Sequence, residues 1–116
     1  MKNDNLIHVK SKKFAIRIIN TFKYLQTEKK EFVLSKQMLR SGTAIGALIK
    51  ESEFAQSRKD FLNKLYIALK EANETLYWIK LLYKTDYLAE IQFKSLEHDI
   101  TEIIKLLTSI CKSSIK

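Results

Sequence analysis

The chain has 116 residues, with no proline, two glycines, one cysteine and a net charge of +8. A single cysteine excludes an intramolecular disulfide, and the scarcity of turn-forming residues argues against a fold of many short strands. No uncharged apolar run approaches the roughly 20 residues that span a bilayer, and the N-terminus lacks the apolar segment of a signal peptide. We therefore expect a cytoplasmic protein that forms one domain over residues 1–116.

The first half of the chain predicts two helices. The first spans about residues 11–26 and is followed by a polar link over residues 27–31. Its apolar positions recur at spacings of four, four and three, as on one face of a helix: Phe14, Ile18, Phe22 and Leu25. The second helix spans about residues 34–54. Its apolar stripe consists of Leu34, Met38, Ile45 and Ile49.

The second half predicts two more helices with stronger periodicity. Ser57 is the predicted N-cap of a helix over about residues 57–85, with Asp60 as its capping-box acid. The stripe of this helix alternates at spacings of three and four: Leu62, Leu65, Leu69, Ala72, Leu76, Ile79 and Tyr83. A fourth helix over about residues 89–112 repeats the pattern with Leu96, Ile100, Ile103, Leu107 and Ile110. Four amphipathic helices with short links predict an all-α fold, an up-and-down antiparallel four-helix bundle.

Large apolar side chains also lie outside these stripes, notably on the third predicted helix. A stripe wider than one core requires indicates a second buried face, which self-association would supply, although a thick bundle core is the alternative. Gly42 and Gly46, spaced by four, form a groove that a second helix can approach closely, either within the bundle or in another subunit. The candidate interface residues of a homo-oligomer are Gly42, Gly46, Ile67, Trp78 and Leu81.

No combination of residues predicts a catalytic site, a metal site or a cofactor site. A di-iron site in a bundle needs Glu-x-x-His pairs, whereas Ser95 occupies the position three residues before His98. His98 and Asp99 are adjacent, so on a helix they point about 100° apart and cannot orient each other for nucleophilic catalysis. A glycine-rich phosphate loop is absent from the sequence. The protein is therefore predicted not to be an enzyme.

The positive charge is concentrated in the first part of the chain. Residues 1–70 hold 15 Lys and Arg against 6 Asp and Glu, whereas residues 71–116 hold 6 against 7. On the second predicted helix, Lys36, Arg40 and Lys50 lie opposite the apolar stripe, with small residues between them. Such a strip allows a phosphate backbone to approach closely, although basic residues opposite a core are often only the solvated face. The candidate nucleic-acid contacts are Lys36, Arg40, Lys50, Arg58, Lys59 and Lys64.

The second predicted helix also carries a family resemblance. The segment from Leu34 to Ala47 resembles the signature S-x-Q-x-x-R-S-x-x-S-I-x-A-N-x-x-E of a bacterial four-helix bundle family, the 23S rRNA intervening-sequence proteins. That family is related to the accessory variability proteins of diversity-generating retroelements. The similarity continues at Glu51, at residues 59–61, at residues 67–68 and at Glu74, and covers about residues 10–112. Two positions depart from the signature, since Ala44 replaces a serine and Leu48 replaces an asparagine.

The resemblance implies properties that the residue pattern alone does not. It implies a homopentamer of four-helix protomers around a central channel. In the retroelement relatives, it further implies a basic surface that engages RNA or DNA and a partner reverse transcriptase. It implies no catalysis. The sequence thus favours a non-enzymatic, homo-oligomeric protein that binds RNA or DNA, and the alternative is a protein–protein adapter without a nucleic-acid role.

Overall fold

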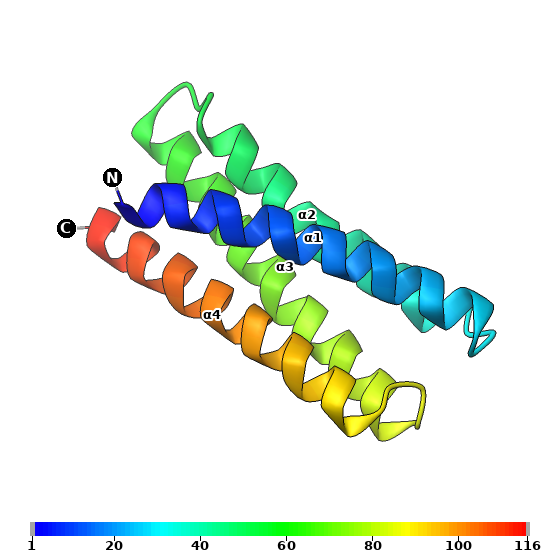
Figure 1. The fold of residues 1–116 in the computed structure, drawn as a ribbon. Coiled ribbons are helices and arrows are strands. Elements are labelled where there is room, and N and C mark those ends of the chain that lie inside the picture. The colour runs from blue at the N-terminus through cyan, green and yellow to red at the C-terminus, as the bar shows by residue number, and fades with distance from the viewer. Residues whose placement is uncertain (1, 116) are drawn as a thin grey trace.

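Four helices follow one another in the computed structural model, which describes the backbone of residues 2–115 and the side chains of residues 5–113. They are α1 (Lys2–Thr27), α2 (Leu34–Ser52), α3 (Arg58–Lys84) and α4 (Glu90–Ile115). Each helix runs antiparallel to the next, and the molecule measures 45 × 21 × 19 Å (Figure 1). Within the described part of the chain there is no strand, and no helix is long and apolar enough to cross a membrane.

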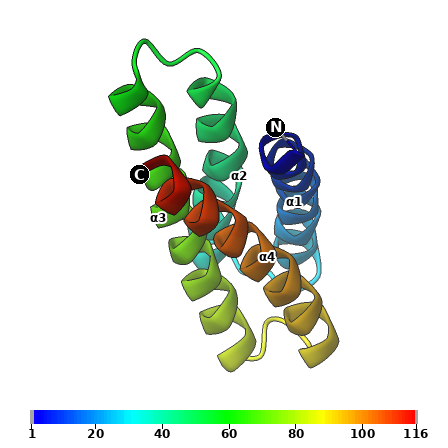
Figure 2. The same cartoon turned by 90° about the vertical axis from the view of Figure 1, so that its left-hand side faces the viewer.

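In the described part of the chain, the backbone of each helix comes close to that of two neighbours and not to that of the diagonal helix. α1 contacts α2 and α4, and α3 contacts the same two helices. Figure 2 accordingly shows α1 and α3 on opposite sides of the molecule, with α2 and α4 between them. This arrangement is the up-and-down bundle that the sequence predicted.

The helix bounds follow the sequence closely except at the start of α1. The predicted start at Ser11 is wrong, since α1 begins at Lys2 and includes His8. The reason is Ile7, which is only 2% exposed and extends the buried stripe of Phe14 and Ile18 toward the N-terminus. At the other ends, α2 stops at Ser52 rather than near residue 54, and α4 runs on to Ile115 rather than to residue 112.

The predicted N-cap of α3 is confirmed. The Ser57 hydroxyl accepts a hydrogen bond from the Asp60 backbone N–H at 3.1 Å. The Asp60 carboxylate in turn accepts from the Gln56 backbone N–H at 3.2 Å. These bonds satisfy donors that a helix N-terminus otherwise leaves without partners.

The buried stripe of α3 is rotated from the predicted one. Leu65, Ala72 and Ile79 are buried as predicted, but Leu62, Leu69, Leu76 and Tyr83 are only half-buried. The remaining buried positions are Ala68, Thr75 and Leu82. Small side chains at Ala68, Ala72 and Thr75 allow α3 to approach α2, and these two helices form the most extensive contact of the bundle. The spacing of the leucines could not predict this buried face, because close approach of two helices favours small residues.

One hydrophobic core joins all four helices. Ile18, Met38, Ile79 and Ile103 are among its fully buried members. The single cysteine, Cys111, also lies in this core, where burial raises the pKa of its thiol above the usual range. This position suits a reduced thiol that acts as a small apolar side chain.

The link between α1 and α2 is built around one buried carboxylate. Glu31 accepts hydrogen bonds from the backbone N–H groups of Val33 (3.1 Å), Leu34 (2.9 Å) and Ser35 (2.7 Å). The Ser35 hydroxyl donates back to the Glu31 carbonyl oxygen at 2.9 Å. Burial alone would raise the pKa of Glu31, but the three backbone donors outweigh it and hold that pKa below its usual range. Glu31 therefore occupies the N-terminus of α2 as an anion.

The two glycines of α2 face α1 and differ in the space around them. A Cβ at Gly42 would lie 2.9 Å from both γ-carbons of the fully buried Ile18. The nearest atoms to a Cβ at Gly46 would be the backbone oxygen of Ser11 at 3.5 Å and its hydroxyl oxygen at 3.6 Å, both ordinary contacts. Both glycines therefore lie in the contact between α1 and α2. The lack of a side chain at Gly42 is explained by packing within the protomer, without a contact between subunits.

The Glu31→Gln substitution should destabilise the protein by about 1–3 kcal/mol at neutral pH, since it removes the charge from three buried hydrogen bonds. Because folding lowers the pKa of Glu31, its contribution is present above the usual pKa of 4.5 and disappears as pH falls through the lower folded-state value. Urea unfolding at several pH values measures this. The difference between the two proteins should shrink in acid, whereas the exposed neighbour Glu28, changed to Gln, should have little effect at any pH.

The same substitution at the two glycines should have opposite effects. Gly46→Ala should stabilise the protein by about 0.5–1 kcal/mol, since alanine has the higher helix propensity and the added methyl group fits. Gly42→Ala gains the same helix propensity, but its methyl group must displace Ile18, and such overpacking costs about 1–3 kcal/mol. The net effect should be a loss of about 1 kcal/mol in the free energy of unfolding. Urea unfolding of both variants provides the comparison. Equal effects would show that the contact of α2 with α1 is not close at Gly42.

Candidate nucleic-acid interface

The six predicted phosphate contacts do not form one strip. Lys36 and Lys50 are 14 residues apart on α2, which is about 21 Å along a helix. Lys36 lies at the α1–α2 end of the bundle, and Lys50 lies at the opposite end, next to the start of α3 (Figure 1). Arg58, Lys59 and Lys64 share that opposite end. The structure thus divides the predicted cations into two separate groups, with Arg40 between them.

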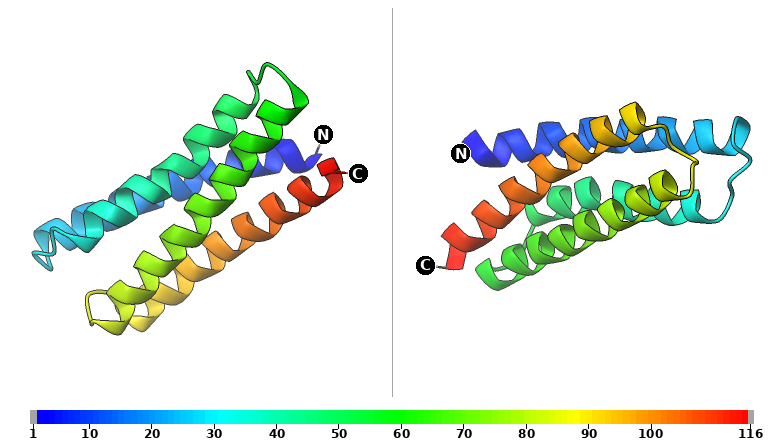
Figure 3. Two further views of the ribbon diagram at one scale, coloured as in Figure 1. Left: turned by 180° about the vertical axis from the view of Figure 1, so that it is seen from behind. Right: turned by 90° about the horizontal axis from the view of Figure 1, so that it is seen from below.

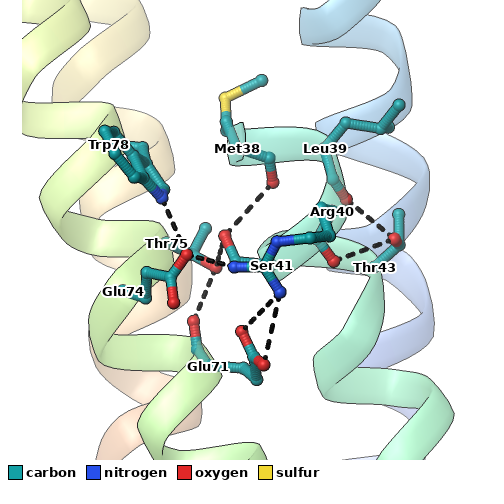
Figure 4. A network of polar contacts seen from close by, with 9 residues as sticks. All are labelled: Met38, Leu39, Arg40, Ser41, Thr43, Glu71, Glu74, Thr75 and Trp78. Atoms are coloured by element: carbon teal, nitrogen blue, oxygen red, sulfur yellow. Dashed lines mark hydrogen bonds and ion pairs between the residues drawn. The ribbon is translucent and has the colours of Figure 1, made fainter. Parts of the chain in front are cut away.

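Arg40 is engaged by two carboxylates of α3. Its guanidinium lies 3.3 Å from the Glu71 carboxylate and also pairs with Glu74, as Figure 4 shows. The Trp78 indole N–H donates to the same Glu74 carboxylate at 3.0 Å. The hydrogen bond with Glu74 raises the pKa of Arg40, while Trp78 and then Arg40 lower the pKa of Glu74. The positive charge of Arg40 is therefore already matched within the protomer, although its side chain is 52% exposed.

A buried hydrogen bond lies beneath this cluster. The hydroxyls of Ser41 and Thr75 are 2.8 Å apart, and both residues are fully buried between α2 and α3 (Figure 4). The Thr75 hydroxyl also lies 2.8 Å from the Glu71 carbonyl oxygen. The Ser41 hydroxyl likewise lies 3.4 Å from the Met38 carbonyl oxygen, so each hydroxyl has a partner on its own helix and the pair adds a buried polar contact between the two helices. Arg40 and Ser41 therefore join α2 to α3 at two adjacent positions.

Most of the cations near the α2–α3 link also have partners. Lys50 pairs with Glu53 at 3.2 Å, and Lys64 pairs with Glu51 at 3.4 Å. The Arg58 guanidinium lies over a phenyl ring, that of Phe61, 5.4 Å from its centroid. Of the six predicted contacts, Lys36 and Lys59 are exposed and have no carboxylate within ion-pair distance among the described residues.

The sequence analysis missed two exposed lysines that precede Lys36 in the chain. Lys29 and Lys30 occupy the α1–α2 link, are exposed, and have no ion-pair partner within the described part of the chain. Glu31 is adjacent, but its carboxylate is occupied by backbone N–H groups of α2. We call Lys29, Lys30 and Lys36 the loop lysines. The pattern Lys-Lys-Glu before a helix could have revealed them, because an acid at that position caps the helix and leaves the lysines without a counter-charge.

The exposed apolar surface also lies elsewhere than predicted. Ile67, Trp78 and Leu81 are half-buried on α3, and Trp78 packs against the core. By contrast, the outer face of α1 exposes four large aliphatic side chains, which we call the α1 strip. They are Leu6 (41% exposed), Val9 (51%), Ile16 (52%) and Ile19 (38%). The sequence analysis missed this strip because it took α1 to begin at Ser11 and considered only the residues that face the core.

One group of potential metal ligands occurs among the described residues. Ligand atoms of His98, Asp99 and Glu102 on α4 lie within 4.8 Å of one another. However, Arg17 Nη1 lies 2.6 Å from the Asp99 carboxylate, and Lys10 Nζ lies 3.4 Å from that of Glu102. A cation at this site would have to displace two that are already present, so the group fits ion pairing better than metal coordination.

The chain is similar to one family of known proteins. The profile of the family described as 23S rRNA-intervening sequence protein matches residues 3–109. A solved structure from Bacteroides thetaiotaomicron VPI-5482, described as a protein of unknown function from the S23 ribosomal protein family, is 60% identical to this chain. Its TM-score is 0.94, and the match covers 95% of this chain and 98% of that one. No curated protein matches the chain.

Arg40→Gln should destabilise the protein by about 1 kcal/mol, a modest loss because solvent screens a half-exposed guanidinium. Combined with Glu74→Gln in a double-mutant cycle, it should show a coupling of about 0.5–1 kcal/mol in urea unfolding. Lys36→Gln serves as the control on the same helix and should change stability by less than about 0.5 kcal/mol. If the two single variants on α2 were equally neutral, the α3 carboxylates would not hold Arg40 in solution.

Proposed function

The chain belongs to the 23S rRNA-intervening sequence protein family, and we propose that it is a non-enzymatic, homo-oligomeric protein that binds RNA or DNA through the loop lysines. The observation that carries the proposal is the distribution of paired and unpaired charge. Carboxylates neutralise Arg40, Lys50 and Lys64, so the excess positive charge of the chain, +8 in total, resides on other lysines.

The loop lysines suit a phosphate backbone. Lys29, Lys30 and Lys36 lie at one end of the bundle, and the one acidic side chain buried among them, Glu31, is already engaged. Phe32 is 47% exposed in the same link and offers an aromatic face on which an unpaired base can stack. Lysine contacts to phosphates carry no sequence information, so the proposed binding is largely independent of sequence.

Two faces of the protomer support self-association. The α1 strip is exposed, and Ile67, Trp78 and Leu81 of α3 are half-buried. The two helices lie on opposite sides of the bundle (Figure 2). The α1 strip also carries exposed lysines, including Lys12, so pairing this strip with its own copy would bring like charges together. A head-to-tail contact of α1 with α3 would instead join two different faces of the protomer. Repeated contacts of that kind close into a ring when the rotation permits, and the pentamer that the resemblance implied is one such ring.

Charge reversal of the loop lysines should weaken binding without unfolding the protein. The triple variant Lys29→Glu, Lys30→Glu, Lys36→Glu should lower affinity for a short RNA or duplex DNA, and the salt dependence of binding should fall by about three counterions. The control reverses three exposed lysines on the outer face of α4, Lys94, Lys105 and Lys112, and so changes the net charge equally. Fluorescence anisotropy at several salt concentrations measures both. Equal losses of affinity in the two triple variants would mean that only net charge matters. If the unmodified protein failed to bind at low salt, the proposed function would be rejected.

A charge placed in the α1 strip should dissociate the oligomer. Ile16→Asp puts a carboxylate in the middle of the strip, whereas Ile91→Asp changes an aliphatic residue on α4 that is 84% exposed and lies outside it. Sedimentation equilibrium should give the mass of the 13.6 kDa protomer for the first variant and an unchanged oligomer for the second. An unmodified protein that is monomeric at high concentration would contradict the proposal.

A further inference from the structure

The contact between α1 and α4 differs from the other three helix contacts of the bundle. It is the least extensive of them, and the two helix axes are inclined to each other in the views of Figures 1 and 3. We call this contact the α1–α4 seam. It joins the first helix of the chain to the last, so no link holds it together.

Ion pairs bridge the α1–α4 seam. The Arg17 guanidinium donates to the Asp99 carboxylate at 2.6 Å and to the Ser95 carbonyl oxygen at 3.3 Å. About two turns earlier on α1, Lys10 donates to Glu102 at 3.4 Å. The side chains of both ion pairs are 32–42% exposed. Ion pairs at such exposure contribute little to stability and are screened further by salt.

Two hollows lie along the seam. One has a volume of about 310 Å³ and lies between the Thr21–Tyr24 part of α1 and Gln92 and Leu96 of α4. The other, of about 80 Å³, lies under the ion pairs and is lined by Phe14 and Ile103. A hollow of about 440 Å³ also lies between α1 and α2, so it is the smaller extent of the contact that distinguishes the seam. Less buried area there opposes separation.

The other three contacts are closed by tight or buried interactions. α1 and α2 meet where Gly42 admits Ile18, and α2 and α3 share the buried Ser41–Thr75 hydrogen bond. α3 and α4 are joined by the stacked rings of Tyr83 and Phe93, whose centroids are 4.3 Å apart. Each hairpin, α1–α2 and α3–α4, is thus a tight unit, and the two units are joined firmly only along α2 and α3.

We propose that the bundle opens locally at the α1–α4 seam, with the hairpins turning about the α2–α3 contact, and that ionic strength controls this opening. Salt screens the Lys10–Glu102 and Arg17–Asp99 pairs and so favours the open form. Opening exposes the apolar floor of the seam, including Phe14 and Ile103, while the contact of α2 with α3 stays intact. This opening does not depend on nucleic-acid binding or on self-association. It is a local opening that requires less free energy than global unfolding, as occurs in many native proteins.

Thiol labelling tests the proposal, because the chain has one cysteine that can be removed. In a Cys111→Ser background, Ile103→Cys places a thiol at the floor of the seam, and Ile79→Cys places one in the core on α3, away from α1. The Ile103→Cys thiol should react with a thiol reagent on the order of tenfold faster than the Ile79→Cys thiol under native conditions. Its rate should rise several-fold further between low and high salt, whereas the other rate should not.

Removal of the seam carboxylates provides the second arm. Asp99→Asn combined with Glu102→Gln should accelerate labelling at Ile103→Cys in low salt and abolish the response to salt. Glu90→Gln combined with Glu97→Gln, two carboxylates of α4 outside any ion pair in the described chain, should do neither. Equal rates at the two thiols, rising together with global unfolding in urea, would overturn the proposal. If the charge variants instead destabilised the whole bundle, labelling at Ile79→Cys would also become faster, and this result too would overturn the proposal.

Discussion

The close approach of α2 to α3 is the constraint on which the rest of the structure depends. Ser41 and Thr75 share a buried hydrogen bond there, and small side chains of α3 allow the two backbones to come near. Directly outside this bond, Arg40 spans two carboxylates of α3. A buried hydroxyl pair and an ion-pair cluster both require particular distances, so together they set the register of one helix against the other. The hydrophobic core alone would tolerate several registers.

This constraint also determines where positive charge remains available. Arg40, in the middle of α2, joins α2 to α3 through two carboxylates, and an arginine engaged in this way is a poor phosphate ligand. The cap on α2 has a related effect, since the Glu31 carboxylate is engaged by backbone N–H groups of α2 and makes no ion pair with Lys29 or Lys30 in the described part of the chain. The family signature on α2 therefore includes residues that stabilise the fold, whereas Lys29 and Lys30 lie in the link before the signature and Lys36 lies within it.

Sequence periodicity was sufficient for the helices and their order, because amphipathic spacing and the Ser57 cap are local properties. It was insufficient wherever the partner is distant in the chain. Arg40 and Glu74 are separated by 34 residues, so their pairing follows from the packing of α2 on α3 and not from any local pattern. The start of α1 was missed for a different reason. Leu6, Ile7 and Val9 are too few to show a helical repeat, and only the burial of Ile7 in the finished core shows that the helix extends so far.

We propose that the fold uses Arg40 of α2, whereas binding uses Lys29 and Lys30 of the preceding link together with Lys36 of α2. A nuclear magnetic resonance titration with a short RNA at low salt tests it most directly, since each backbone amide and the single Trp78 indole N–H are observed separately. The account predicts shifts at the amides of Lys29, Lys30 and Lys36, and none at the indole N–H that Glu74 holds. Shifts centred on Arg40 and on the Trp78 indole, with the α1–α2 link unchanged, would contradict it.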